Sequence, residues 1–404
     1  MDNKINNTWK IYLLTFISFL SGTLQFVIGG ILDKIAVSVG VPISTAGQLG
    51  TAFSLAGAIG TPVIIMITAK MDGRKRLLMG LTAILLSTFS TVVLPGFGFL
   101  MVSRIVLGIG MGVYGISAYS IVAKLAPPER LARAMSNLSM GSSASLVIGV
   151  PIGRVVANSY GWKSIFWAIG FFIILAMIAA IMYIPTSKAE APIPLGNQLA
   201  YLKKPRIAMY LGAAFFMFIS YSVVNSYITP FLIGLMPLIE GKMSIILMGL
   251  GIASVVGAKL GGFYADRLGA RSTLVGGMAI QAFALILISI VPKTVVLICP
   301  LLMIWAIAAW ICGPTFNFNL ISVAPEASGI MLSLNSTFVQ FGFAAGAGIG
   351  GIVLRGFSII AISWVGAIAV VLAACVALAA FGHTNLSTMT TLSNEELDLE
   401  QLEN

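Results

Sequence analysis

Residues 66–78, MITAKMDGRKRLL, lie between two long apolar segments, and the expected fold follows from them. The basic residues of this stretch are Lys70, Arg74, Lys75 and Arg76. Short loops rich in Lys and Arg stay on the cytoplasmic side of a membrane. The stretch therefore predicts a membrane protein and fixes the side from which each later segment starts. A related loop, GFYADRLGAR at residues 262–271, indicates that the chain is internally duplicated.

The composition excludes a soluble protein. Of the 404 residues, 58% are hydrophobic and only 9% are charged, and the mean hydropathy is +1.02. The net charge of +10 comes from basic residues scattered through short loops, which is typical of membrane topology and not of nucleic-acid binding. Cys299, Cys312 and Cys375 lie inside apolar segments without the spacing of a metal site. We therefore expect no metal and no cofactor.

The apolar segments predict an all-α membrane protein, because a membrane-spanning helix needs about 20 apolar residues. Twelve segments qualify. They are approximately 11–33, 47–69, 77–94, 99–123, 133–157, 164–184, 207–232, 243–264, 272–291, 295–322, 329–354 and 360–382.

The chain divides into two halves. Residues 1–184 form one predicted bundle and 207–382 the other, joined by a proline-containing cytoplasmic linker at 185–206. An acidic cytoplasmic tail follows at 383–404. An even number of spans places both termini on one side, and the concentration of Lys and Arg predicts that this side is the cytoplasm.

A repeat links the two halves. The pair Pro-Glu at 128–129 recurs at 325–326, and GVPIG at 149–153 corresponds to GAGIG at 346–350. The offset agrees to within one residue with that between the two basic loops. A constant offset predicts two pseudo-symmetric six-helix bundles, related by an axis along the membrane normal.

These motifs give the chain a family resemblance. It resembles the major facilitator superfamily over nearly its whole length, and within it the twelve-helix drug/proton antiporter branch, near bacterial sugar-efflux and purine-efflux pumps. The residues that carry the resemblance are the 262–271 loop, Gly73-Arg74-Lys75, Arg104-x-x-x-Gly108-x-x-x-Gly112 and Gly149-x-Pro151-x-Gly153. The resemblance implies a secondary exporter in the bacterial inner membrane that works by alternating access and proton antiport.

Two positions depart from the family pattern. Lys70 occupies the usual aspartate position of the first loop, and Asp72 follows two residues later. Where the pumps commonly have an acidic residue in helix 1, this chain has Gln25. An uncoupled facilitator of the same solutes therefore stays open as an alternative to proton antiport.

Ionisable residues inside a membrane are costly and need a reason. Arg104 and Gln25 lie at depths that let them meet, so Arg104 holds substrate or coordinates Gln25, or else is a structural arginine. Asp33 is the best remaining proton acceptor, although a solvated helix end is the simpler interpretation. Arg154 and Lys259 lie near helix ends and could snorkel. Lys259 could also pair with Asp266, and a role in substrate binding is the alternative for either residue. The predicted coupling and gating residues are Asp33, Arg74, Arg104, Asp266, Arg267 and Arg271.

The resemblance implies that Asp266, with Arg267 and Arg271, forms a clasp that holds the cytoplasmic gate shut. The alternative is a loop that only sets topology. Gly149, Pro151 and Gly153 act as a hinge or as close packing, and the sequence does not separate these readings.

A binding pocket needs apolar walls with a few polar groups. The predicted substrate-binding residues are Gln25, Arg104, Tyr114, Tyr221, Asn225, Tyr227, Trp310, Asn317, Asn335 and Gln340. Neutral amides and aromatic rings suit an uncharged, flat or sugar-like ligand better than a cationic drug. The expected substrates are thus sugars, nucleobases, nucleosides or amphipathic drugs. Helix packing is the alternative role for each residue.

Other functional classes fit less well. A membrane enzyme needs a buried nucleophile with its base, or a metal cluster, and neither pattern occurs. A non-transporting receptor stays open. The expected partners are the lipid bilayer, a small-molecule substrate and protons, with the protein acting as a monomer and without nucleic acid.

Overall fold

The computed structural model describes residues 2–127, 130–186 and 195–402. The side chains of 2–7, 132, 195, 197–199 and 383–402 also lie outside the description. Most of the linker and the acidic side chains of the tail therefore fall outside it. The helices are α1 (Asp2–Val39), α2 (Ile43–Ala46), α3 (Gln48–Ile67), α4 (Gly73–Val93), α5 (Phe97–Leu125), α6 (Leu131–Ala144), the π-helical turn η2 (Ser145–Gly149), α7 (Val150–Tyr160), α8 (Lys163–Tyr183), α9 (Leu195–Leu202), α10 (Pro205–Asn225), α11 (Ile228–Leu235), η3 (Pro237–Lys242), α12 (Met243–Ile290), α13 (Val295–Val323), η4 (Pro325–Ala327), α14 (Ser328–Gly356) and α15 (Ala361–Leu402).

The helices account for the expected membrane spans. Within the described residues, 11 helical stretches are long and apolar enough to cross a membrane. The longest contains α12, whose 48 residues break at Gly269, with φ 80° and ψ 160°. This conformation favours glycine because it lacks a Cβ. The two parts of α12 are the predicted spans 243–264 and 272–291, so the prediction of an all-α, twelve-span membrane fold is confirmed.

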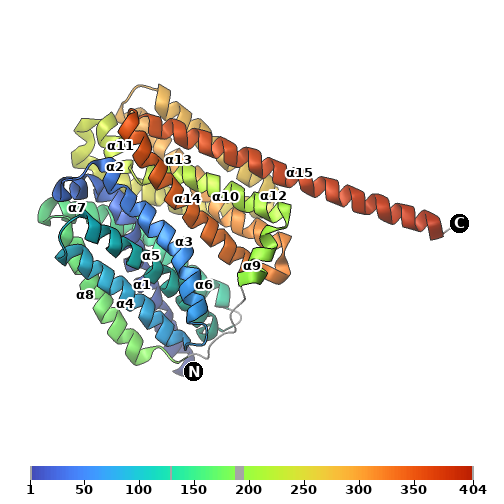
Figure 1. Ribbon diagram of the computed structural model, residues 1–404, viewed down its shortest axis with the longest axis horizontal. Helices are drawn as coiled ribbons and strands as arrows, with labels where there is room; N and C mark the ends of the chain where they lie inside the picture. Colours follow the sequence, from blue (N-terminus) through green and yellow to red (C-terminus); the bar gives the residue numbers. More distant parts are fainter. Residues whose placement is uncertain (1, 128–129, 187–194, 403–404) are drawn as a thin grey trace.

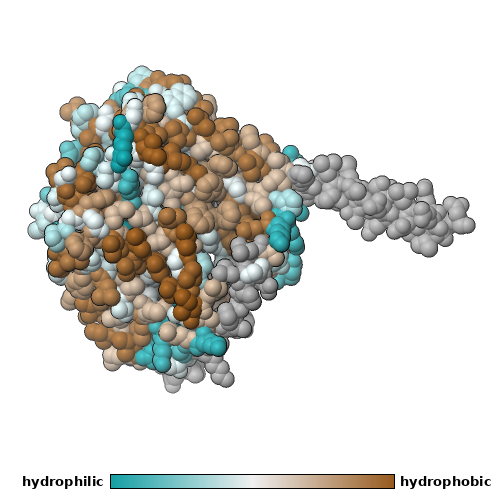
Figure 2. Space-filling model, viewed as in Figure 1, coloured by the Kyte–Doolittle hydropathy of each residue, from teal (hydrophilic) through white to brown (hydrophobic). Residues whose placement is uncertain are grey.

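The helices form two bundles, α1–α8 and α10–α15, that lie side by side (Figure 1). We call the end near α9 and the N-terminus the linker end, and the opposite end, near α2 and α11, the far end. Hydrophobic residues cover much of the visible face, and hydrophilic residues gather towards its edges (Figure 2). This distribution is that of a protein whose middle band faces lipid.

Two helical segments at the boundary between the bundles are interrupted. The predicted span 207–232 is not continuous, because α10 ends at Asn225 and α11 begins at Ile228. Tyr227 between them has φ −116° and ψ 20°, and its hydroxyl donates to the carbonyl of Ala347 at 2.8 Å. This bond ties the break to α14. In α1, Ile31 departs from helical geometry in the same way.

Glycines bring α5 against its neighbours. A Cβ on Gly108 would lie 2.1 Å from the carbonyl oxygen of Phe53, and one on Gly112 would lie 1.9 Å from Oγ1 of Thr61. Both contacts are far too short for any larger residue. The glycines after Arg104 therefore let α5 and α3 pack at close range, as small residues do in membrane interfaces.

The basic loop after α3 is bound within the first bundle. The Asp72 carboxylate caps α4 by accepting from the backbone N–H groups of Arg74 and Lys75, at 2.9 and 3.2 Å. Arg74 Nη2 donates to the carbonyl of Ile181 in α8. Arg76 is 5% exposed. The loop therefore has a structural role as well as a topological one, because it joins the start of α4 to α8.

Candidate functional site

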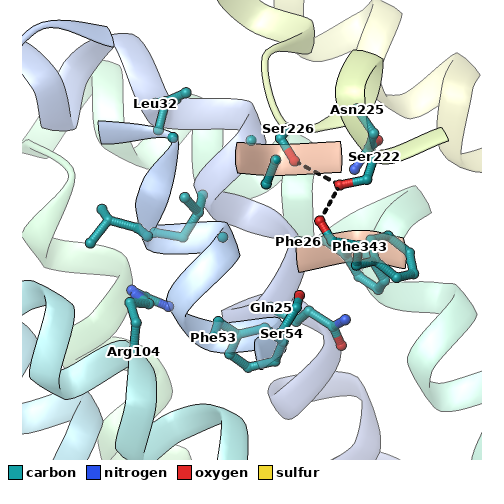
Figure 3. A pocket seen from close by; sticks show the side chains of 16 residues that line it. Gln25, Phe26, Leu32, Phe53, Ser54, Arg104, Ser222, Asn225, Ser226 and Phe343 are labelled. Atoms are coloured by element: carbon teal, nitrogen blue, oxygen red, sulfur yellow. Dashed lines mark hydrogen bonds between the residues drawn. The ribbon is translucent and has the colours of Figure 1, made fainter. Parts of the chain in front are cut away.

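A cavity lies between the two bundles. Its volume is about 60 Å³. Its lining residues are Gln25, Phe26, Ile28, Gly29, Leu32, Gly47, Leu49, Gly50, Phe53, Ser54, Arg104, Ser222, Asn225, Ser226, Phe343 and Ala347. Arg104 and the group Ser222, Asn225 and Ser226 lie on opposite sides of it (Figure 3). The cavity is therefore built jointly by both bundles, as a site that alternates between two sides requires.

The first bundle supplies Arg104 and Gln25. Arg104 is 2% exposed, its Nη1 donates to the carbonyl of Leu24 at 3.2 Å, and its guanidinium carbon lies 5.3 Å from the centre of the Phe166 ring. Its Nε has no hydrogen-bond partner among the described residues. Arg104 and Gln25 line the same cavity, so the structure brings these two predicted residues together.

The second bundle supplies hydroxyl and amide groups from the end of α10. Ser222 Oγ donates to the carbonyl of Phe343 at 2.7 Å and lies 3.3 Å from Ser226 Oγ. The Tyr221 hydroxyl donates to Asn225 Oδ1 at 3.2 Å. The break after Asn225 ends the regular α10 helix beside the cavity. Polar side chains and freed backbone groups therefore occur together, where a water-accessible cavity can satisfy them.

A second, smaller cavity adjoins the first. Its volume is about 30 Å³, and the two cavities share Phe26, Gly29 and Asn225. Its aromatic wall contains Trp305, whose ring is stacked on Tyr221 with centres 5.2 Å apart and planes 10° apart. The remaining walls are mainly aliphatic. The smaller cavity therefore provides an apolar extension of the site.

Trp310 supports the second cavity without lining it. Its Nε1 donates to the Tyr221 hydroxyl at 3.1 Å. That hydroxyl thus receives one hydrogen bond while it donates another to Asn225. Trp310 positions a lining residue.

Other predicted binding residues are used in packing. The Tyr114 hydroxyl donates to the carbonyl of Leu14 at 2.7 Å, and Tyr227 is bonded to α14 as described. Neither Tyr114 nor Tyr227 lines either cavity. Asn335 Nδ2 donates to Asn317 Oδ1 at 2.7 Å, so α13 and α14 are joined by an amide pair. Gln340 lies beside α3, since a Cβ on Gly57 would be 3.2 Å from its Nε2.

The motif Gly149-x-Pro151-x-Gly153 packs against α1. A Cβ on Gly149 would lie 2.1 Å from Oγ1 of Thr23, and one on Gly153 would lie 2.4 Å from Cγ2 of Val27. Pro151 follows the π-helical turn η2 at the start of α7. The glycines thus permit close approach, and the π-helical turn marks where the helical hydrogen bonding changes.

A charged cluster joins the bundles at the far end. Arg154 Nη1 lies 2.5 Å from Asp33 Oδ1, and Arg154 Nη2 lies 3.7 Å from Glu240 Oε1. Lys34 Nζ lies 3.3 Å from the same Glu240 oxygen. The expectation that Arg154 snorkels is wrong, because its side chain is 0% exposed. Asp33, with 17% of its side chain exposed, is likewise not a free solvated end.

Other hydrogen bonds reinforce this closure. Thr229 Oγ1 donates to the carbonyl of Gly29 at 2.9 Å. Arg355 donates to the hydroxyls of Ser44 and Thr45, at 3.4 and 3.1 Å. Each bond joins the first bundle to the second. The far end of the protein is therefore closed over the two cavities in this structure.

The predicted clasp at the linker end is not assembled in this structure. Asp266, Arg267 and Arg271 are exposed. They make no ion pair with another described residue, and Arg267 instead lies over the Phe263 ring at 4.4 Å. Lys259 is also exposed, and no ion pair joins it to Asp266. The charged contacts that join described residues of the two bundles thus lie at the far end.

Sequence reasoning missed several lining residues. Ser222 and Ser226, the residue that follows α10, are four positions apart and so lie on one face, which the sequence alone could have indicated. Phe26, Phe53 and Phe343 are cavity walls that no motif marks. Single phenylalanines in an apolar helix look alike in sequence whether they face lipid, core or cavity.

Comparison with known proteins gives a family match, a relative and similar solved structures. Residues 14–347 match the family model described as Major Facilitator Superfamily. The chain is 41% identical over 377 residues to the uncharacterized MFS-type transporter YbcL of Bacillus subtilis (strain 168), covering 93% of this chain and 97% of that protein.

Two solved structures are similar in fold. One is a bacterial homologue of the human lysosomal transporter Spinster in an inward-facing, unoccupied conformation, with a TM-score of 0.73 and 18% identity over 96% of this chain and 98% of that one. The other is the nucleoside transporter NupG, with a TM-score of 0.75 and 14% identity over 92% of this chain and 99% of that one. At these identities the likeness concerns the fold alone.

Proposed function

The chain belongs to the major facilitator superfamily and is a multi-pass membrane transporter rather than an enzyme, and on this premise we propose that it exports a small organic solute. The solute binds in the cavities between the bundles, and the bundles rock around it. The observation that carries this proposal is one cavity lined by both bundles, beneath a far end closed by ion pairs.

The linker end is the cytoplasmic end in this proposal. It carries the basic loop at residues 70–76, and short loops rich in Lys and Arg stay inside. Both termini are then cytoplasmic, and the far end faces outward. We place the protein as a monomer in the bacterial cytoplasmic membrane, because each chain contains its own complete cavity.

The proposed substrate class is a small polar or amphipathic molecule, such as a sugar, nucleobase, nucleoside or drug. Hydroxyl and amide groups of Ser54, Ser222 and Asn225 line the main cavity beside aromatic rings. Such a surface binds hydrogen-bonding groups on a compact apolar body.

Proton coupling is assigned to Asp33. Its carboxylate shares Arg154 with Glu240, and Glu240 belongs to the other bundle. A proton on Asp33 would release Arg154 to pair more fully with Glu240, which would stabilise the closed far end. A proton entering from outside would therefore favour the state that opens inward, as antiport requires. Asp266, Arg267 and Arg271 would clasp the linker end in the opposite state.

Two alternatives differ in what crosses the membrane. An uncoupled facilitator would move the same solute without protons, as Gln25 in helix 1 suggests. A receptor would bind solute and move nothing.

The test uses proteoliposomes and a reversible lock. Cysteines replace Thr51 and Gly348, because a Cβ on Gly348 would lie 3.5 Å from Oγ1 of Thr51, an ordinary contact distance between α14 and α3, and Cys299, Cys312 and Cys375 are replaced by alanine. We expect a pH gradient to drive transport of one member of a sugar, nucleobase, nucleoside and drug panel, oxidant to stop it, and reductant to restore it. Transport that ignores the pH gradient indicates the facilitator, and binding without transport indicates the receptor.

A further inference from the structure

The electrostatics of the site are set by one cation. Among the described residues that line the two cavities, Arg104 is the only charged one. It forms no ion pair with a described residue, and its partners are the Leu24 carbonyl and the face of Phe166. A buried guanidinium without a counter-ion is costly, and ionisable groups at such positions commonly meet a partner or a substrate.

The unsatisfied groups of the site are all hydrogen-bond donors. Of the described residues lining the cavities, two have a buried side-chain polar atom without a partner, namely Nε of Arg104 and Nε1 of Trp305. Each side chain is at most 2% exposed. An N–H group buried without a partner loses its hydration without compensation. A ligand that satisfies both N–H groups therefore carries one acceptor atom near Arg104 and another near Trp305.

The two cavities are chemically different and adjacent. The larger holds the guanidinium with serine and amide groups, and the smaller has an aliphatic wall with the Tyr221–Trp305 stack. Phe26 belongs to both linings, so movement of its side chain would join them. A single ligand with an anionic end and an apolar end would then fill both.

We propose that the site takes an amphipathic organic anion: its carboxylate or similar oxyanion meets Arg104, and its ring, which carries a hydrogen-bond acceptor, enters the cavity beside Trp305. This inference rests on the proposed function and names the substrate class of that site. It revises the expectation of an uncharged ligand. The reason is that the sequence revealed the amides but not that Arg104 lies in the cavity without a carboxylate partner.

The test compares three molecules of nearly equal shape. Binding of quinolineacetate, quinolineacetamide and quinolylethylamine to the purified protein in nanodiscs is measured by titration calorimetry. We expect the acid to bind about tenfold more tightly than the amide, because hydrogen bonds to charged groups typically exceed neutral ones by about that factor. The amine should bind most weakly. This comparison needs no variant.

Variants then locate the two ends of the ligand. Arg104→Met should weaken binding of the acid about tenfold and change amide binding little, whereas Arg104→Lys should keep part of the preference. Trp305→Phe should weaken both ligands. The matched controls are Arg133→Met and Trp364→Phe, an exposed arginine and a half-exposed tryptophan outside both cavities. The controls should bind like the unmodified protein.

The outcomes separate this inference from the function it rests on. Equal binding of acid, amide and amine would overturn the anion assignment, and so would binding of none of them. Reversible, lockable transport of a neutral sugar would overturn it too, while leaving the transporter intact. Tight binding of the acid without transport of any solute would instead overturn the exporter and keep the anion site.

Discussion

Neutralising either carboxylate of the far-end cluster should have opposite effects on the conformational equilibrium. Glu240→Gln removes a carboxylate of the second bundle that pairs with Lys34 and Arg154 of the first. Asp33→Asn removes a carboxylate that shares a bundle with Arg154. The first change should therefore open the far end, and the second should close it further by leaving Arg154 to Glu240.

The expected magnitudes follow from burial. Glu240 has 52% of its side chain exposed, so its pairs should contribute about 1 kcal/mol, or about fivefold in the opening equilibrium. Arg154 is 0% exposed and lies 2.5 Å from Asp33. Loss of one partner of a buried pair costs about 3 kcal/mol of folding stability. Asp33→Asn should therefore lower the melting temperature far more than Glu240→Gln does.

The assay is a spin-label distance across the far end. Labels at Val37 and Leu238, which are 84% and 101% exposed and lie in different bundles, report opening in a background without native cysteines. Glu240→Gln should enrich the long distance, and Asp33→Asn should enrich the short one. In a variant that carries both changes, Asp33→Asn should no longer close the far end, because Arg154 then has no carboxylate of Glu240 to pair with. The proposed role of Arg154 would be refuted if Asp33→Asn opened the far end. It would also be refuted if Asp33→Asn closed the far end equally well in the presence of Glu240→Gln.

Three further predictions concern packing, the site and a helix cap. Gly112→Ala should destabilise the protein by about 1–3 kcal/mol, because its Cβ would overlap Thr61. The control Gly115→Ala has open space at its Cβ and should leave stability unchanged. Thermal unfolding compares the two variants, and equal melting temperatures would contradict the packing argument. Tyr221→Phe should weaken solute binding about tenfold by removing the hydroxyl that orders Asn225; calorimetry with unchanged affinity would count against the site. Asp72→Ala should cost about 1 kcal/mol through the lost α4 cap, which thermal unfolding detects and Asp72→Asn should largely restore.

The sequence by itself determined the fold class. A membrane interior offers no water to backbone groups, so long apolar segments must become helices. Their length, the basic loops and the repeated motifs were enough to predict twelve spans in two bundles, and the break at Gly269 falls between two predicted spans. Pairs close in the sequence, such as Ser222 and Ser226, were also readable in principle.

Only the tertiary structure decided which polar residues share a site. Arg104 and Arg154 are both isolated arginines in apolar helices, yet one lines a cavity without an ion pair among the described residues and the other is held by Asp33 and Glu240. Their partners come from other helices and, for Glu240, from the other bundle. Helical periodicity predicts which residues share a face of a helix, but it does not predict which helix packs against that face. That depends on how separate helices pack, which is set by contacts distant in the sequence.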